Sequence, residues 1–250
     1  MTKILLSGCF GKMGRVIADV VSRREDAVIS AGVDLSDGSA DFPTYHTLDE
    51  VTEPVDAIID FSHPSALEGL LAFAREKRVP AVLATTGYSD AQIEKIKAAS
   101  GETPLFFSFN MSLGINLLVE LSKKAVSILG DGFDIEIVEA HHNQKIDAPS
   151  GTAVMLADGI NEALGEPYSL IYDRHDRRKK REKKEIGMHA IRGGTIVGEH
   201  QVIFAGRDEI ITLSHSARSK EVFAVGAVSA AVFMHGKPSG LYNMKDLIAE

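Results

Sequence analysis

The first third of the chain alternates short apolar runs with helical patterns, and this alternation restricts its fold more than any other feature. Helical patterns near Lys12 to Arg23, Ala66 to Glu76 and Asp90 to Ala99 separate runs that are suited to buried strands. Strands that alternate with crossover helices predict a parallel sheet with both faces covered. The strand candidates are Lys3 to Ser7, Val28 to Val33, Val55 to Phe61, Val79 to Ala84 and Leu105 to Phe109.

The pattern changes after Asn110. A long amphipathic helix is expected over about Leu113 to Leu129, and a period of two in the residues around Ile135 then indicates a strand. A helix near Thr152 to Leu164 follows. Three further strands with no helix between them predict a mainly antiparallel sheet; they are Ile186 to Val197, Gln201 to Ala205 and Ile210 to Ser214.

A last helix, about Glu221 to Met234, is expected to return to the first domain. The predicted fold is therefore α/β. Residues 1–111 and 217–250 would form a Rossmann-like, doubly wound parallel sheet. Residues 112–216 would form a smaller α+β domain.

Composition narrows the class of protein. A hydrophobic content of 44% with 25% charged residues is typical of a globular chain, and a net charge of −8 provides no general attraction for nucleic acid. No apolar run approaches the about 20 residues of a membrane span, and the N-terminal run is too short for a signal peptide. A single cysteine excludes an intrachain disulfide. We expect a cytoplasmic protein with no membrane or nucleic-acid partner.

One segment, residues 174–184, is dense in Arg and Lys. A solvated, mobile loop is the expected interpretation of such a charge run. Contact with an anion or a partner is the alternative.

Gly8, Gly11 and Gly14 lie between the first expected strand and the first expected helix, where a dinucleotide-binding domain has its pyrophosphate turn. Glycine lets the backbone approach the phosphates, and the helix start directs free N–H groups and its positive dipole end toward them. The spacing departs from G-x-G-x-x-G, so a simple tight turn is the alternative. Cys9, inside the turn, is better explained as a small tolerated side chain than as a reactive thiol.

Asp34 closes the second expected strand, close to where an acidic residue accepts hydrogen bonds from the ribose of the adenosine. A carboxylate here favours NADH. An NADP site usually has a neighbouring arginine, but Leu35 and Ser36 follow instead. Lys12 could compensate in part, so NADPH use stays open, and a plain strand-ending turn is the alternative role for Asp34.

Chemistry-bearing side chains concentrate after the strand that contains Ile137. His141 and His142 are adjacent in this strand, so they should project to opposite sides and do different work. Lys145 adds a third potential cation, and such a group could hold an anion and deliver protons.

The same segment leads into a helix. Asp147 is expected to order the turn and Ser150 to cap the helix. The amides of Gly151 and Thr152 would then lie at the helix start, where they could hold a carboxylate.

A histidine pair alone is more often structural than catalytic, and histidine pairs also bind zinc. Third and fourth ligands are not recognisable at a nearby spacing, and Lys145 would repel a cation. The sequence therefore predicts no metal site.

The segment from Glu139 to Ala153 resembles the signature E-[A/L]-H-H-x-x-K-x-D-A-P-S-G-T-A of the dihydrodipicolinate reductase family at every specified position. Similar blocks occur in the expected order along the whole chain. They are Gly8 to Gly14, Asp60 to Pro64, Thr85 to Gly87, Asn110 to Gly114, Ile186 to His189, Arg192 to Gly194 and Gly240 to Tyr242.

The resemblance implies NAD(P)H-dependent reduction of 4-hydroxy-tetrahydrodipicolinate to tetrahydrodipicolinate with loss of water, in lysine and diaminopimelate biosynthesis. By motif position, His141 would be the acid/base residue and Lys145 the proton donor. His142 would contact the dicarboxylate substrate, and Gly151 and Thr152 would bind one of its carboxylates. Arg192 is a further candidate for an anion contact.

The resemblance also implies nucleotide contacts and a homotetramer built through the sheet of the second domain. The last nucleotide block reads Ser-Phe-Asn-Met, where many relatives have Ala-x-Asn-Phe, which puts its detailed contacts in doubt. The implied nucleotide contacts are Gly8, Cys9, Phe10, Gly11, Lys12, Met13, Asp34, Ala84, Thr85, Thr86, Ser108, Phe109, Asn110 and Met111.

Three alternatives stay open. An apolar face shared by Ile196, Val202, Phe204 and Ile211 would serve as the tetramer interface, and burial beneath the domain's own helices is equally consistent with it. Another amino-acid-pathway dehydrogenase would share the nucleotide domain but would not explain residues 141–152. A catalytically silent nucleotide sensor would not need His141 and Lys145.

Overall fold

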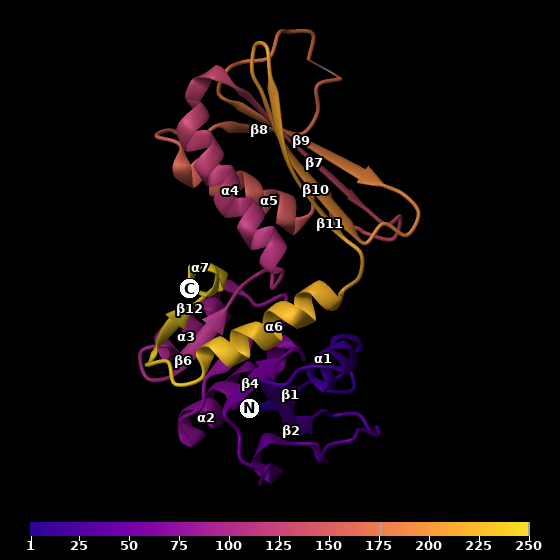
Figure 1. Ribbon diagram of the computed structural model, residues 1–250, viewed down its shortest axis with the longest axis vertical. Helices are drawn as coiled ribbons and strands as arrows, with labels where there is room; N and C mark the ends of the chain where they lie inside the picture. Colours follow the sequence, from indigo (N-terminus) through magenta and orange to yellow (C-terminus); the bar gives the residue numbers. More distant parts are fainter. Residues whose placement is uncertain (176, 250) are drawn as a thin grey trace. The chain divides into compact units, whose positions relative to one another are not determined.

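A computed structural model describes residues 1–175 and 177–249 of the chain. The chain divides into two compact units. The first contains Met1–Leu113 and the segment that begins at Lys220, and the second contains Gly114–Ser219. Figure 1 shows that the indigo and purple segments share the first unit with the yellow C-terminal segment. Over the described residues, no helix combines the length and the apolar character needed to cross a membrane.

The first unit is built on a seven-stranded sheet in the order β12-β6-β5-β4-β1-β2-β3. Every neighbouring pair is parallel. The order 3-2-1-4-5-6 is that of a Rossmann fold, so the predicted doubly wound sheet is confirmed. The strands are β1 (Thr2–Ser7), β2 (Ala27–Val33), β3 (Thr44–Tyr45), β4 (Ala57–Asp60), β5 (Ala81–Leu83), β6 (Pro104–Phe107) and β12 (Gly240–Tyr242).

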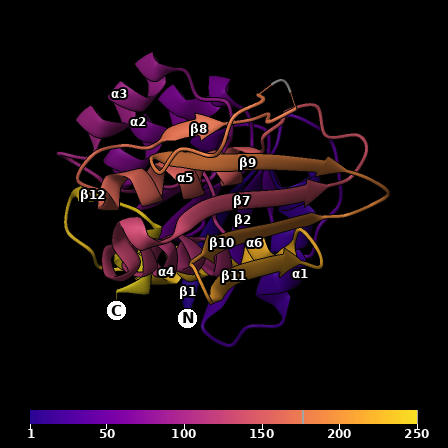
Figure 2. The ribbon, with the colours of Figure 1, turned by 90° about the horizontal axis from the view of Figure 1, so that it is seen from above.

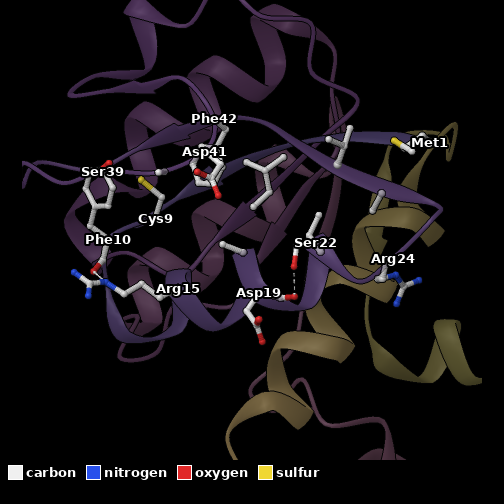
Figure 3. A pocket seen from close by; sticks show the side chains of 16 residues that line it. Met1, Cys9, Phe10, Arg15, Asp19, Ser22, Arg24, Ser39, Asp41 and Phe42 are labelled. Atoms are coloured by element: carbon white, nitrogen blue, oxygen red, sulfur yellow. Dashed lines mark hydrogen bonds between the residues drawn. The ribbon is translucent and has the colours of Figure 1, made fainter.

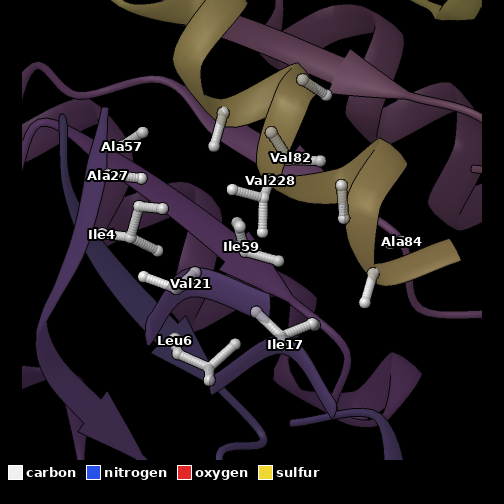
Figure 4. Packing of buried hydrophobic residues seen from close by; sticks show 14 of the residues in the cluster. Ile4, Leu6, Ile17, Val21, Ala27, Ala57, Ile59, Val82, Ala84 and Val228 are labelled. Atoms are coloured by element: carbon white, nitrogen blue, oxygen red, sulfur yellow. The ribbon is translucent and has the colours of Figure 1, made fainter. Parts of the chain in front are cut away.

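Helices cover both faces of this sheet. One face packs on α1 (Lys12–Ser22) and α6 (Glu221–Met234), and the other packs on α2 (Leu67–Lys77) and α3 (Asp90–Ala99). Figure 4 shows side chains of α1 and α6 meeting those of the central strands. The remaining elements of this unit are the 3-10 turns Leu48–Glu50 and Pro64–Ala66 and the short helix α7 (Met244–Ile248).

α6 packs unusually close to the backbone that follows β6. A Cβ on Gly226 would come 1.7 Å from the carbonyl oxygen of Met111, so only glycine fits there. Half of the residues of this helix are buried and none is exposed, which explains why its sequence is apolar on all sides rather than amphipathic. The helix near the C-terminus is thus part of the core of the first unit.

The second unit contains a five-stranded sheet in the order β11-β10-β7-β9-β8, which can be followed in Figure 2. Two helices, α4 (Leu113–Leu129) and α5 (Gly151–Ala163), pack on one of its faces. The 3-10 turn Gly130–Gly132 follows α4. The strands are β7 (Asp134–His141), β8 (Ser169–Ile171), β9 (Glu185–Arg192), β10 (Gly198–Ala205) and β11 (Ile210–Ala217).

This sheet is mixed, with an antiparallel half and a parallel half. β10 is antiparallel to β11 and β7, whereas β9 is parallel to β7 and β8. The predicted α+β domain is confirmed, but its parallel half was not expected. β9 and β10 follow each other in sequence without pairing, because β7 lies between them and buries Ile135 and Ile137 at the centre.

The two faces of this sheet differ. Val202 and Phe204 are fully buried against α4 and α5, and Ile211 packs on the same cluster. Of the two alternatives for this apolar face, burial beneath the unit's own helices is therefore the one that the structure supports for these three residues. Ile196 lies in the loop that begins at Gly193, not in a strand as predicted, because the chain turns there with Gly194 at φ +49°.

The opposite face of the same sheet carries Val138, Gln201, Ile203 and Thr212, which are half-buried or exposed. Its residues alternate with the inward ones along each strand, as a sheet with one covered face requires.

The basic segment 174–184 is partly tied to the sheet, apart from residue 176, which lies outside the described residues. Arg181 binds Glu136 at 3.1 Å and Asp134 at 2.9 Å, and Arg174 binds Glu185 at 2.8 Å. Other basic side chains of the segment, such as Lys180 and Lys183, are exposed. The prediction of a solvated loop is therefore wrong for the two arginines, whose charges are paired with acidic residues of β7 and β9.

Candidate active site

The last residue of β7, His141, is a buried histidine whose ring is held by the same strand. Its Nδ1 lies 2.6 Å from Oε2 of Glu139, two residues earlier. Residues i and i+2 of a strand share a face, which is why these two side chains meet. The pair lies on the side of the sheet that α4 and α5 cover.

Glu139 is only 1% exposed and accepts four hydrogen bonds. Arg192, the last residue of β9, donates from Nη1 at 2.8 Å and from Nη2 at 2.7 Å, and the amide of Ser150 donates at 3.0 Å. Burial favours the protonated acid, but the donors Arg192, His141 and Ser150 outweigh it and hold the pKa of Glu139 below its usual value. Glu139 is therefore a carboxylate.

Lys145 lies in the turn after β7 and is tied to Asp147, with Nζ 2.9 Å from Oδ1. Its side chain is 23% exposed, so the ammonium group is accessible. The hydrogen bond from Lys145 lowers the pKa of Asp147. The backbone carbonyl of Asp147 accepts a hydrogen bond of 2.6 Å from Nη2 of Arg192. A continuous chain of contacts thus connects His141, Glu139, Arg192, Asp147 and Lys145.

The helix α5 begins directly after this turn. Ser150 is its N-cap, with Oγ accepting a hydrogen bond of 3.2 Å from the amide of Ala153, as predicted. Its first turn contains no acidic residue, and Gly151 is exposed. A helix start of this kind presents N–H groups and a positive dipole end to an anion.

Two further residues, His142 and Arg192, were predicted to contact the substrate. His142 follows the strand and is half-buried, and its carbonyl accepts a hydrogen bond of 3.1 Å from the amide of Lys145. The guanidinium of Arg192 donates to Glu139, to Asp147 and, at 2.7 Å, to the carbonyl of Ile191. Arg192 therefore joins Glu139 to the turn that contains Asp147, and its contact with a substrate anion stays a prediction.

A second buried histidine, His200 of β10, belongs to the site and was missed in the sequence. Its Nε2 lies 3.1 Å from Oγ of Ser150, and its ring meets that of His141 edge to face with centroids 5.1 Å apart. Its Nδ1 is buried without a hydrogen-bond partner among the described residues. The alternation of buried and exposed residues along β10 places His200 on the face of Val202 and Phe204, and this period was the available signal.

Burial lowers the pKa of His200 to about 4, with a smaller effect of the neighbouring His141. The native state therefore keeps this imidazole neutral, whereas the unfolded chain takes up a proton below pH of about 6.5. The free energy of unfolding should fall by up to roughly 3 kcal/mol as the pH drops from about 6.5 to about 4, and the full contribution is present above that window. Chemical denaturation of the wild type and of His200→Gln at several pH values measures this. The gap between the two proteins should change across this window, and a constant gap would contradict the neutral imidazole.

The predicted nucleotide residues gather in the first unit, in the turns after β1, β2, β5 and β6. Gly8 has φ +80°, and its amide binds the carbonyl of Val33 at 2.8 Å. A Cβ on Gly14 would come 2.2 Å from the carbonyl oxygen of Gly8, so the turn needs glycine there as well. α1 has no side-chain cap and no acidic residue in its first turn. Its first amides lack intrahelical partners, as at any helix start, and suit a phosphate.

Asp34 follows β2 and is joined to the glycine turn. Its Oδ2 accepts a hydrogen bond of 2.9 Å from the amide of Phe10, and its Oδ1 accepts one of 2.9 Å from the amide of Ser36. Each carboxylate oxygen has a further lone pair, so Asp34 can still accept from a ribose hydroxyl. Cys9 is 3% exposed and burial raises the pKa of its thiol to about 11, which agrees with a small packed side chain rather than a reactive one.

The other nucleotide blocks have ordered turns. The hydroxyl of Thr85 donates to Asp60 at 2.7 Å, so Thr85 is committed to a buried carboxylate at the end of β4. The amide of Ser112 donates to Oδ1 of Asn110 at 2.9 Å. Phe109 is 77% exposed, and its ring meets that of Phe107 edge to face with centroids 5.0 Å apart.

A pocket of about 690 Å³ lies in the first unit beside α1 and β2 (Figure 3). Of the glycine turn, only Cys9 and Phe10 line it, and the rest of its wall comes from Met1, α1, Arg24, β2 and residues 39–42. The pocket therefore lies on the β2 side of the turn and includes none of the catalytic candidates. Across the described parts of the chain, His, Cys, Asp and Glu side chains form no cluster of three or more that could hold a metal ion.

Comparison with known proteins identifies the family. The family model "Dihydrodipicolinate reductase, N-terminus" matches residues 2–111, and "Dihydrodipicolinate reductase, C-terminus" matches residues 114–248. A 4-hydroxy-tetrahydrodipicolinate reductase of Caldanaerobacter subterraneus subsp. tengcongensis is 50% identical over 248 residues, which is 99% of this chain and 98% of that protein. One from Clostridium novyi is 49% identical, over 99% of this chain and 98% of that protein.

Solved structures give the same fold. A dipicolinate-bound dihydrodipicolinate reductase from Paenisporosarcina sp. TG-14 superposes with a TM-score of 0.80 at 24% identity and covers 97% of each chain. A probable dehydrogenase from Thermotoga maritima superposes with a TM-score of 0.60 at 13% identity, covering 99% of this chain and 92% of that one. Because the two family models together span nearly the whole sequence and full-length relatives are about half identical, the chain belongs to the dihydrodipicolinate reductase family.

Proposed function

We propose that this chain catalyses the NAD(P)H-dependent reduction of 4-hydroxy-tetrahydrodipicolinate to tetrahydrodipicolinate with loss of water, a step of lysine and diaminopimelate biosynthesis. The observation that carries the proposal is the continuous network from the buried His141 through Glu139, Arg192 and Asp147 to the accessible Lys145. The names of the half-identical relatives support it. A similar structure is described as dipicolinate-bound, which supports a planar dicarboxylate as the class of substrate.

Different residues of the second unit deliver protons and bind the substrate. Lys145 donates a proton to the substrate, because its ammonium group is accessible and is held in one place by Asp147. His141 acts as acid and base through Nε2, since Nδ1 is bound to Glu139. The amides of Gly151 and Thr152 hold a substrate carboxylate at the start of α5, and His142 adds a contact from the same turn. NAD(P)H supplies the hydride when it is bound.

We infer that the nucleotide is bound by the first unit, residues 1–111 and 217–250 in the predicted domain division, and that the substrate is bound by residues 112–216. The pyrophosphate would lie against the glycine turn from Gly8 to Met13, and the adenosine ribose against Asp34. The remaining contacts would come from residues 84–86 and 108–111. An exposed ring at Phe109 is consistent with a surface that a ligand covers.

NADH is the proposed preferred nucleotide, because Asp34 would repel a 2′-phosphate and has Leu35 and Ser36 rather than an arginine beside it. Lys12 is exposed near the glycine turn, where its positive charge can compensate in part for the missing arginine. We therefore expect activity with NADPH as well.

A coupled assay tests the function and the preference together. Dihydrodipicolinate synthase generates the unstable substrate, and oxidation of NADH or NADPH is followed by absorbance at matched concentrations. We expect turnover with both nucleotides and a higher kcat/KM with NADH. Absence of turnover with either nucleotide, in a protein that still binds NADH, would favour the silent nucleotide sensor instead.

We further propose that the chain forms homotetramers and acts in the cytoplasm. The half-exposed sheet face around Val138, Gln201, Ile203 and Thr212 is the surface we assign to the subunit contact, in place of the buried face around Phe204. The single, buried Cys9 suits a reducing compartment. The molar mass in solution tests the oligomeric state.

A further inference from the structure

Glu139 is the residue on which the network of the second unit converges, and nothing in the proposed chemistry yet assigns it a task. It connects three segments: its own strand β7, where it binds the ring of His141, the end of β9 through Arg192, and the start of α5 through Ser150. A fully buried carboxylate is costly unless its charge is paired and hydrogen-bonded, and here both conditions are met.

The charge state of Glu139 decides which nitrogen of His141 carries a proton. A carboxylate can only accept hydrogen bonds, so at 2.6 Å the Nδ1 of His141 must be the donor. Nε2 is then the nitrogen that is left to gain or lose a proton. Without this acceptor, either tautomer of the neutral ring would be available.

The neighbouring strand β10 leaves space beside Nε2 of His141. A Cβ on Gly198, the first residue of β10, would lie 3.2 Å from Nε2, so a larger residue would crowd this nitrogen. The second imidazole, His200, lies edge to face beside the first and is kept neutral by burial. The charged groups that are joined to His141 by hydrogen bonds, directly or through one residue, are thus Glu139 and Arg192.

We propose that Glu139 is a positioning residue for the reduction: by accepting the Nδ1 proton of His141, it fixes the ring and its tautomer and reserves Nε2 for proton exchange with the substrate. This inference rests on the proposed function of His141. Arg192 has a supporting part, because its two hydrogen bonds keep Glu139 ionised and its third connects the pair to the turn that carries Lys145.

The first test is spectroscopic and needs no variant. In protein labelled with ¹⁵N-histidine and loaded with NADH, the nitrogen shifts of His141 should be those of the Nδ1–H tautomer in its neutral form. A neutral ring protonated at Nε2 would overturn the proposal. This measurement does not depend on turnover, so it separates failure of the positioning role from failure of the proposed reaction.

The second test is the isosteric substitution Glu139→Gln, which removes the charge and can donate as well as accept. The wrong tautomer lowers turnover by about 10⁴-fold in a serine protease triad. Because Lys145 still delivers a proton here, we expect a smaller loss in kcat, about a hundred-fold. The KM for NADH should stay unchanged, and the Nδ1–H signature should weaken.

Glu136→Gln is the matched control. Glu136 lies on the same strand and binds an arginine and a histidine in the same way, at 3.1 Å to Arg181 and 2.8 Å to His189, but on the other face of the sheet. The Glu136→Gln variant should therefore retain a kcat within about three-fold of the wild-type value. Equal losses in the two variants, or full activity in Glu139→Gln, would reduce Glu139 to a structural ion pair and overturn the assignment.

Discussion

Replacing Lys145 with alanine should lower kcat by about a thousand-fold, the middle of the range for loss of a positioned proton donor, while the affinity for NADH stays as it was. The ammonium group is the proposed acid, and the turn that carries it has no other lysine. Its ion pair with Asp147 is largely exposed on the acidic side, so the fold should lose at most about 1 kcal/mol. Stopped-flow turnover and a fluorescence titration with NADH measure the two effects separately.

Lys123→Ala is the matched control for this variant. Lys123 belongs to the same unit, is 20% exposed against 23% for Lys145, and forms an ion pair of 2.7 Å with Glu162. The Lys123→Ala variant removes the same charge and the same side chain at a position outside the network of His141, so kcat should stay close to that of the wild type. A large loss of NADH affinity in Lys145→Ala would contradict the division of work between the two units.

Replacing Gly14 with alanine should weaken NADH binding by about ten- to a hundred-fold, which corresponds to the roughly 1–3 kcal/mol that an overpacked site costs. The added methyl group would lie 2.2 Å from the carbonyl oxygen of Gly8 and 2.6 Å from that of Cys9. Both contacts are backbone, so the glycine turn itself must move, and the amides at the start of α1 move with it. Calorimetric titration with NADH and equilibrium unfolding measure the loss.

Gly69→Ala provides the comparison. Gly69 lies near the start of α2 in the same unit, and a Cβ there meets nothing within 4 Å, so alanine should raise the stability by up to about 1 kcal/mol and leave NADH binding alone. At saturating NADH, Gly14→Ala should recover most of its kcat, because the proposed acid and base lie in the other unit. Unchanged NADH affinity in Gly14→Ala would remove the glycine turn from the nucleotide site.

The helices could be predicted closely because their ends carry local signals. α3 was expected at Asp90 and begins there, since Ser89 caps it and forms a reciprocal capping box with Gln92. α4 and α6 also match their predicted bounds. The short strands β3, β8 and β12 were not predicted, because two or three residues are too few to show a period and each is defined by its pairing with another strand.

The candidate site, too, could be predicted only in part from the sequence. His141 and Lys145 could be recognised from one contiguous motif. Arg192, however, lies 53 residues from Glu139, and His200 lies 50 residues from Ser150, so no local pattern could show that these side chains meet. Their pairing depends on β7 lying between β9 and β10, and the placement of strands in a mixed sheet was the part of the fold that the sequence left open.

Because α6 belongs to the first unit, it restricts the order in which the two units can fold during translation. The first unit is discontinuous, and its core needs buried residues such as Ala224, Val228 and Met234 that are translated near the end. The second unit is one uninterrupted stretch. During synthesis the second unit can therefore fold first, whereas the sheet of the first unit has only α1 on one of its faces until α6 has been translated.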